Sequence, residues 1–143
     1  MKLTSKLIVL GIIENDNGEI LISQRFEEEL PEVHLKWDLP GGKNEFGESL
    51  EETLRREIFE ETGLNAEVLN LLPKTISKVW EYADRRQHTV VLCYRCKLID
   101  GQLHLNDRKI NDLKWISKEE LNSFEFLPSS KEFINNFFEN YGN

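Results

Sequence analysis

Three glutamates between residues 57 and 61 are the strongest candidates for chemistry in this chain. Glu57, Glu60 and Glu61 are spaced by three and four positions, which places them on one face of a helix. Like charges at this spacing repel and destabilise an isolated helix by roughly a few tenths of a kcal/mol per pair. A divalent cation would turn that repulsion into attraction, and oxygen-only ligands favour Mg²⁺ or Mn²⁺ over zinc. A solvated acidic face is the alternative for three glutamates taken alone.

The residues around these glutamates form a longer pattern. Residues 42–64 read GKNEFGESLEETLRREIFEETGL, which fits Gly, five residues, Glu, seven residues, then Arg-Glu-apolar-x-Glu-Glu-x-Gly-apolar. All the fixed positions agree; they are Gly42, Glu48, Arg56, Glu57, Ile58, Glu60, Glu61, Gly63 and Leu64. At average residue usage, a chance match in a chain this short has a probability below about one in a million. The segment resembles the Nudix box of the hydrolases that act on nucleoside diphosphate derivatives.

This resemblance implies a metal site. The implied ligands of one or more Mg²⁺ ions, with Mn²⁺ as a substitute, are the Gly42 carbonyl and the carboxylates of Glu57, Glu60 and Glu61. Arg56 would hold a neighbouring carboxylate in place, and Glu48 would stabilise the loop or reach the metal through water. The metal would bridge a diphosphate, neutralise its charge and lower the pKa of an attacking water.

A carboxylate must then accept the proton of that water. Glu57 is the first choice for this base, and with Glu60, Glu61 and Arg56 it forms the expected catalytic set. Members of the family differ in the residue that serves, and some use an acid outside the box. Asp112 and Asp107, which precede the strand around Trp115, are the candidates here.

The segment Trp37–Lys43 (WDLPGGK) resembles the entry to the box in the MutT-like branch. That branch hydrolyses nucleoside triphosphates to monophosphate and pyrophosphate. Arg25 closes a strand as the corresponding arginine near the phosphates does. We therefore expect Arg25, Trp37 and Lys43 to contact substrate. The structural alternatives are core packing for Trp37 and a surface cation for Arg25.

Three departures bear on the substrate. Where oxidised-guanine enzymes carry Asn or Asp at the start of the last helix, this chain has Ser129 or Ser130, and a hydroxyl reads a purine less specifically. Tyr82 lies near the position of a marker tyrosine in dinucleoside-polyphosphate hydrolases, although a strand tyrosine can also be structural. The proline that marks ADP-ribose pyrophosphatases is replaced by Val79 and Trp80. Ser130 and Tyr82 are thus further candidate substrate contacts, together with Asp112.

The N-terminal half predicts two strands followed by a helix. Apolar residues 7–13, the turn signal at 16–18 and the strand 20–25 indicate a β-hairpin. Charged residues 26–36 predict a surface loop. The helix is predicted over Glu48–Thr62, because apolar residues recur every four positions and Gly63 follows as a terminator.

The C-terminal half predicts strands at 68–72, 76–82, 89–98 and 113–116, with polar residues 84–87 connecting two of them. Ser117 predicts the cap of a short helix, and Ser129 with Glu132 forms a capping-box pattern for a last helix. The mixture predicts an α/β or α+β class with a sheet covered by helices. The resemblance implies an α/β/α sandwich with a mixed, curled sheet.

Length and composition limit the setting. The 143 residues, 39% hydrophobic and 31% charged, predict a single globular domain over residues 1–143. The net charge of −8 argues against a nucleic-acid polymer as partner. Residues 7–13 are too short to span a bilayer, so no membrane partner is expected. Cys93 and Cys96, the two cysteines, predict structural burial and a reducing cytoplasm.

The leading hypothesis is a Mg²⁺-dependent pyrophosphohydrolase that acts on a small nucleotide, most plausibly a nucleoside triphosphate, as a monomer or homodimer. A dinucleoside-polyphosphate or ADP-ribose hydrolase is the alternative substrate class. Two non-enzymatic alternatives are a nucleotide-binding sensor on the same fold and a cation-binding structural domain. All box carboxylates are retained, which favours turnover.

Overall fold

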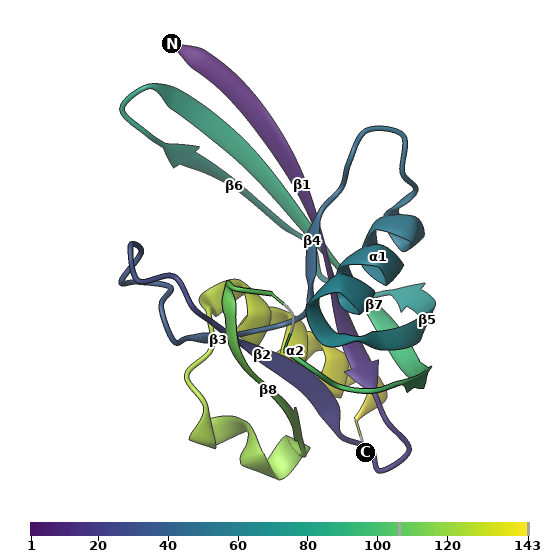
Figure 1. Ribbon diagram of the computed structural model, residues 1–143. Helices are drawn as coiled ribbons and strands as arrows, with labels where there is room; N and C mark the ends of the chain where they lie inside the picture. Colours follow the sequence, from purple (N-terminus) through teal and green to yellow (C-terminus); the bar gives the residue numbers. More distant parts are fainter. Residues whose placement is uncertain (106, 143) are drawn as a thin grey trace.

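The computed structural model describes residues 1–105 and 107–142. One mixed sheet forms the centre of the molecule (Figure 1). Its strands are β1 (Lys2–Glu14), β2 (Ile20–Arg25), β3 (Trp37–Asp38), β4 (Gly41–Lys43), β5 (Leu64–Leu71), β6 (Ile76–Glu81), β7 (Arg85–Gly101) and β8 (Ile110–Ile116). The main path runs β3-β2-β1-β7-β5, with β4 beside β1, β6 beside β7 and β8 beside β2.

The long strands β1 and β7 are parallel partners from the Lys2–Arg85 pair to the Glu14–Lys97 pair. The predicted β1–β2 hairpin is present, but its strands pair only at Glu14 and Ile20. Beyond that point β2 diverges from β1 and pairs with β3 and β8. The short strand β4 takes the place of β2 beside β1, opposite Ile8 to Leu10. The sheet is therefore open between β2 and β1, and β4 lies at this opening.

Helices cover both faces of the sheet. α1 (Leu50–Thr62) packs on one face through Leu54 and Ile58, and α2 (Pro128–Tyr141) packs on the other through Phe133 and Phe137. A short 3₁₀ helix, η1 (Lys118–Ser123), precedes α2. Each helix closes its own buried apolar cluster, which confirms the predicted layering of helices around a mixed sheet.

Several element boundaries differ from the predictions. Residues 85–87 belong to β7, and the β6–β7 connection is a tight turn in which the Tyr82 N–H donates to the Arg85 carbonyl at 2.8 Å. The capping box predicted at Ser129 is wrong, because α2 begins at Pro128 with Leu127 as its cap. Cys93 and Cys96 are buried and free, as predicted. Among the described residues, no helix is long and apolar enough to cross a membrane.

Candidate active site

The helix α1 is fixed at both ends by local signals. At its start, the Ser49 side chain accepts a hydrogen bond from the Glu52 N–H at 3.1 Å, and the Glu52 carboxylate accepts one from the Ser49 N–H. At its end, Gly63 adopts a left-handed φ of 78° and its N–H donates to the Phe59 carbonyl. These caps fix where the helix begins and ends. Burial of Leu54 and Ile58 sets its rotation, so that Glu57 and Glu61 lie beside β4.

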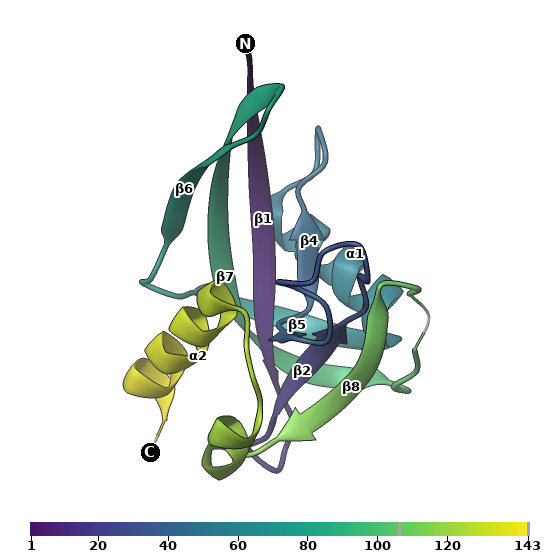
Figure 2. The same ribbon diagram turned by 90° about the vertical axis from the view of Figure 1, so that its left-hand side faces the viewer.

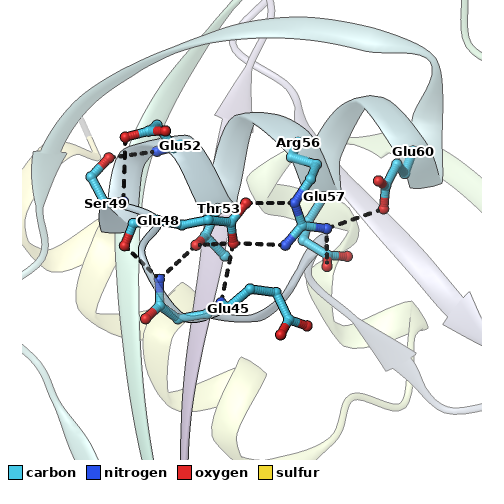
Figure 3. A network of polar contacts seen from close by, with 9 residues as sticks. Glu45, Glu48, Ser49, Glu52, Thr53, Arg56, Glu57 and Glu60 are labelled. Atoms are coloured by element: carbon cyan, nitrogen blue, oxygen red, sulfur yellow. Dashed lines mark hydrogen bonds and ion pairs between the residues drawn. The ribbon is translucent and has the colours of Figure 1, made fainter.

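Arg56 joins three of the predicted carboxylates (Figure 3). Its guanidinium donates twice to Glu48, at 2.7 and 2.9 Å, once to Glu57 at 2.9 Å and once to Glu60 at 3.3 Å. The hydrogen bonds from Arg56 lower the pKa of Glu48 to about 2, and these carboxylates raise the pKa of Arg56. Thr53 also donates to Glu48 at 2.9 Å. The loop before α1 is thereby tied to the helix by charge-assisted hydrogen bonds.

Glu57 and Glu61 form a hydrogen-bonded carboxyl pair on the inner side of α1. Burial raises the pKa of Glu57, which Arg56 partly offsets. Burial, followed by the neighbouring charge of Glu57, raises the pKa of Glu61 well above its ordinary value. From the backbone, the Glu61 carboxylate accepts a long hydrogen bond, at 3.4 Å, from the Gly41 N–H. Within the described residues no Lys or Arg forms an ion pair with it.

The backbone at Gly41 and Gly42 passes directly over these carboxylates. A Cβ at Gly42 would lie 2.5 Å from the Glu57 carboxyl carbon, so only glycine permits this approach. Gly41 has a φ of 146°, and a Cβ there would lie 2.1 Å from the Val9 carbonyl oxygen. Glu61 is buried and, among the described residues, has no basic partner, whereas the half-buried Glu57 is held by Arg56. Beside the bare backbone of Gly42, the two carboxyl groups form an oxygen-only donor set that suits a hard divalent cation.

These groups face a cleft of about 300 Å³ at the opening between β1 and β2. Four cationic side chains line it, and they are Lys6, Arg25, Lys43 and Lys109. Asp38 and Asp107 also contribute to its walls. A site that combines two carboxylates with a ring of cations can hold a metal and the phosphates that the metal binds.

The predicted residues separate into two groups. The structure brings Arg25, Gly42, Lys43, Glu57 and Glu61 together around the cleft. The other predicted residues do not line it, and they are Trp37, Glu48, Arg56, Glu60, Tyr82, Asp112 and Ser130.

Two of these residues are held by contacts elsewhere. Glu60 bonds to Arg56 and lines a neighbouring depression with Asp107. Trp37 is buried and packs edge-on against Phe124.

Across residues 1–105 and 107–142, no three acidic, His or Cys side chains already form a metal-binding group.

Tyr82 and Asp112 lie on different elements. Tyr82 is exposed at the β6–β7 turn. Asp112 lies in β8 opposite Gln24 of β2, and its carboxylate accepts a hydrogen bond from the Leu113 N–H.

Asp38 is one of three charged cleft residues that the sequence analysis did not single out, and the others are Lys6 and Lys109. Its carboxylate accepts a hydrogen bond from Arg25 at 3.2 Å and another from the buried hydroxyl of Ser130. Arg25 is also paired with Glu27 at 2.6 Å. The start of α2 is thus connected to the cleft through Asp38. An acidic residue between Trp37 and Leu39, both of which are buried, was the available signal.

Comparison with known proteins identifies the family. The model of the NUDIX domain matches residues 4–137. The 8-oxo-dGTP diphosphatase of Escherichia coli K12 is 30% identical over 129 residues, which cover 89% of this chain and 92% of the relative. The nucleoside triphosphatase NudI of an Enterobacter species is 29% identical over 132 residues, with 88% and 92% covered.

Two further matches extend the comparison. A putative mutator protein MutT4 of Mycobacterium tuberculosis is 37% identical over 90 residues, but the match covers 62% of this chain and only 36% of that protein. Among solved structures, a MutT NUDIX hydrolase from Burkholderia pseudomallei has a TM-score of 0.77 at 25% identity, with 93% and 98% of the two chains covered. The chain belongs to the Nudix family and is a MutT-like Nudix hydrolase.

Proposed function

We propose that this enzyme is a Mg²⁺-dependent pyrophosphohydrolase that cleaves nucleoside triphosphates to monophosphate and pyrophosphate. The observation that carries the proposal is the Glu57–Glu61 pair, which lies beside Gly42 in a cleft lined by four cationic side chains. Carboxylates alone would repel a polyphosphate, whereas cations alone would not bind Mg²⁺. The combination supports a ligand that consists of a metal ion and a phosphate chain.

The chain supplies each part of this chemistry. Glu57, Glu61 and the Gly42 carbonyl would hold the divalent cation, which supplies charge neutralisation and a more acidic water when bound. Arg56 fixes the orientation of Glu57, and Glu48 fixes Arg56. Lys43 and Arg25 would bind phosphate oxygens at the cleft wall.

Two acids are candidates for the base that accepts the proton of the attacking water. Glu57 remains the first choice, because it lines the cleft and is oriented by Arg56. Asp107 is the alternative outside the box, since it lines both the cleft and the depression that contains Glu60. Asp112 is a weaker candidate, because its carboxylate is engaged by the Leu113 N–H.

The proposed preference is for nucleoside triphosphates with modest discrimination among bases. The relatives named as an 8-oxo-dGTP diphosphatase and a nucleoside triphosphatase support this class. The Ser130 hydroxyl donates a hydrogen bond to the Asp38 carboxylate. Its side chain has no second polar group that could hydrogen-bond to a purine edge. Catalytic efficiencies should therefore lie within about a hundredfold across several triphosphates.

The test is kcat/KM with Mg²⁺ across canonical and oxidised nucleoside triphosphates, ADP-ribose and diadenosine polyphosphates. The expected products are monophosphate and pyrophosphate. A preference for ADP-ribose or a diadenosine compound above every triphosphate would overturn the substrate class. Sedimentation of the same sample decides between monomer and homodimer. The cytoplasmic location suggested by two free cysteines stays a prediction.

A further inference from the structure

Three strands extend beyond the helices and form a projecting ribbon, which we call the arm. It consists of residues 2–7 of β1, residues 85–90 of β7 and the strand β6. Figures 1 and 2 show from two sides that the arm carries the N-terminus and the β6–β7 turn away from α1 and α2. The sheet faces of the arm are therefore not covered by either helix.

The strand registers define which side chains share a face of the arm. Ile8, Val91 and Ile76 lie side by side across the three strands, and all three pack against the core on the α2 side. Side chains two, four and six residues further out lie on the same face. The successive rows are Lys6, Thr89 and Lys78, then Thr4, Gln87 and Trp80, then Lys2, Arg85 and Tyr82.

This face of the arm is basic, although the chain as a whole carries a net charge of −8. Its cations are Lys2, Lys6, Lys78 and Arg85, and the three rows contain no Asp or Glu. Arg85, at the tip, is paired with Asp84 of the β6–β7 turn at 3.0 Å, and Lys2, Lys6 and Lys78 are the remaining cations of this face. On the opposite face the acidic residue lies within the strands, because Arg86 is paired with Glu81 at 2.9 Å. Segregation of charge onto one face creates a local positive potential that the net charge conceals.

Two exposed aromatic rings lie among these cations. Trp80 and Tyr82 are each 43% exposed. The Lys78 ammonium lies 4.1 Å from the centre of the Trp80 ring, and the Arg85 guanidinium lies 4.2 Å from the centre of the Tyr82 ring. Aromatic rings interleaved with cations on an open sheet provide stacking surfaces for bases and ion pairs for phosphates.

The arm face is continuous with the cleft. Lys6 and Ile8 line the cleft, and Lys6 is also the innermost cation of the arm. Neighbouring rows are about 6.6 Å apart along a strand, so the face extends about 13 Å from Lys6 to the row of Tyr82. The two rings lie in successive rows and could stack two bases. A dinucleoside polyphosphate brings only one base beyond the cleft, whereas a polynucleotide brings several.

We propose that the arm binds single-stranded nucleic acid. Bases stack on Trp80 and Tyr82, phosphates pair with Lys2, Lys78 and Arg85, and Lys6 leads the strand towards the cleft. The net charge of −8, which predicts no polynucleotide partner, is an average over the whole molecule. The basic face of the arm is a local exception to it. The binding goes beyond nucleoside triphosphate hydrolysis and requires no turnover.

The experiment is fluorescence anisotropy of labelled oligothymidylate and oligouridylate of about eight nucleotides, titrated with the full chain in EDTA. Binding should weaken with salt, with a log–log slope of about −0.7 for each phosphate contact. Trp80→Ala should weaken binding about tenfold through lost stacking. Arg85→Ala should reduce the salt slope by about 0.7.

Matched controls come from the opposite face of the same strands. Val79→Ala and Arg86→Ala should change affinity less than about twofold, and Trp80→Ala and Arg85→Ala should still hydrolyse nucleoside triphosphates at the wild-type rate. Circular dichroism verifies that all four variants are folded. Because EDTA blocks metal-dependent turnover, failure of binding and failure of the proposed hydrolysis are separate results.

Three outcomes would overturn the proposal. The first is no binding at low salt, or equal binding by Trp80→Ala and wild type. The second is equal affinity for duplex and single strands, since paired bases cannot stack on the rings. The third is a homodimer in sedimentation that Trp80→Ala dissociates, which would assign the arm to a second copy of the chain.

Discussion

At the residue scale, Glu57 and Glu61 conflict with each other unless a cation lies between them. Burial raises the pKa of both groups, and the charge of Glu57 raises the pKa of Glu61 further, so their ionised forms cost folding free energy. The Gly42 backbone lies close enough to these carboxylates to bind the same metal ion. The same arrangement that strains the protein alone is suited to a divalent ion.

Replacement of either glutamate by glutamine separates activity from folding. Glu57→Gln and Glu61→Gln should each lower kcat/KM by about a hundredfold or more, equivalent to about 2.7 kcal/mol of transition-state stabilisation. In EDTA at pH 8, Glu61→Gln should unfold in urea at the same or a higher concentration than wild type, because an unpaired buried charge has been removed.

The matched control is Glu52→Gln on the same helix. Glutamine can serve in the capping box as glutamate does, so activity and stability should stay near wild type. Near-normal turnover in both Glu57→Gln and Glu61→Gln would show that this pair does not bind the catalytic metal.

Gly42→Ala tests the close approach of the backbone to the site. The added Cβ would lie 2.5 Å from the Glu57 carboxyl carbon, and this flexible end of a side chain can move away without unfolding the protein. We expect a folded variant with at least about tenfold lower kcat/KM, because a small displacement of a ligand is costly in catalysis. Gly47→Asn is the comparison, since a Cβ there meets nothing within 4 Å and Asn tolerates the left-handed φ of 88° at this position. Equal activity of the two variants would contradict the assignment of Gly42.

At the element scale, α1 and the loop before it behave as one unit because Arg56 connects Glu48 to the helix. The pKa of Glu48 is lowered from 4.5 to about 2. Because the pKa is lowered by folding, the ion pair stabilises the folded state fully at pH values above the pKa of Glu48 in the unfolded chain. That contribution is lost as the pH falls towards 2.

Unfolding by urea in EDTA checks this coupling. Glu48→Gln should be less stable than wild type at pH 7, and the difference should shrink as the pH falls from about 4.5 to about 2. The reason is that wild-type Glu48 becomes protonated over that interval and then resembles the variant. A stability difference that is constant with pH would show that Glu48 contributes by packing alone.

The elements that could be predicted from the sequence are those specified by residues close together in the chain. α1 and its glutamates are specified by neighbours within a few positions, so both the helix and the Nudix box were predicted from residues 42–64. The ends of β1 and β7 are specified by pairing between residues about eighty positions apart, which no local pattern records. Arg85 and Arg86 resembled a loop because they are charged residues on a solvated arm, directly after the turn that Tyr82 and Arg85 close.

The side chains outside the box follow the same division. Ser129 matched a capping pattern, but Pro128 occupies the first turn of α2 and the neighbouring Ser130 bonds to Asp38. Asp38 itself has no motif of its own, and only the fold brings it to Arg25. The box carboxylates that line the cleft were therefore predictable, whereas its far wall was not.

At the scale of the whole molecule, a bound divalent cation should raise the melting temperature. Mg²⁺ that binds the folded state at about a hundred times its Kd adds about 2.7 kcal/mol, which corresponds to about 5–10 °C for a domain of this size. EDTA should abolish activity, Mg²⁺ or Mn²⁺ should restore it, and Zn²⁺ should restore it poorly.

Differential scanning calorimetry with and without Mg²⁺ measures this shift, and Glu61→Gln is the control that should lose most of it. A wild-type melting temperature that is independent of Mg²⁺, together with activity that survives EDTA, would remove the metal from the proposed mechanism.

The parallel pairing of β1 with β7 also has a consequence for how the chain is made. β1 leaves the ribosome long before its main partner, which begins only at Arg85. Until that segment emerges, the apolar stretch 7–13 has no strand to join along most of its length. Pairing between segments this distant in sequence is slow and leaves unpaired strands exposed to aggregation. The yield of folded enzyme should therefore depend on the rate of synthesis and on chaperones that shield the nascent β1 segment.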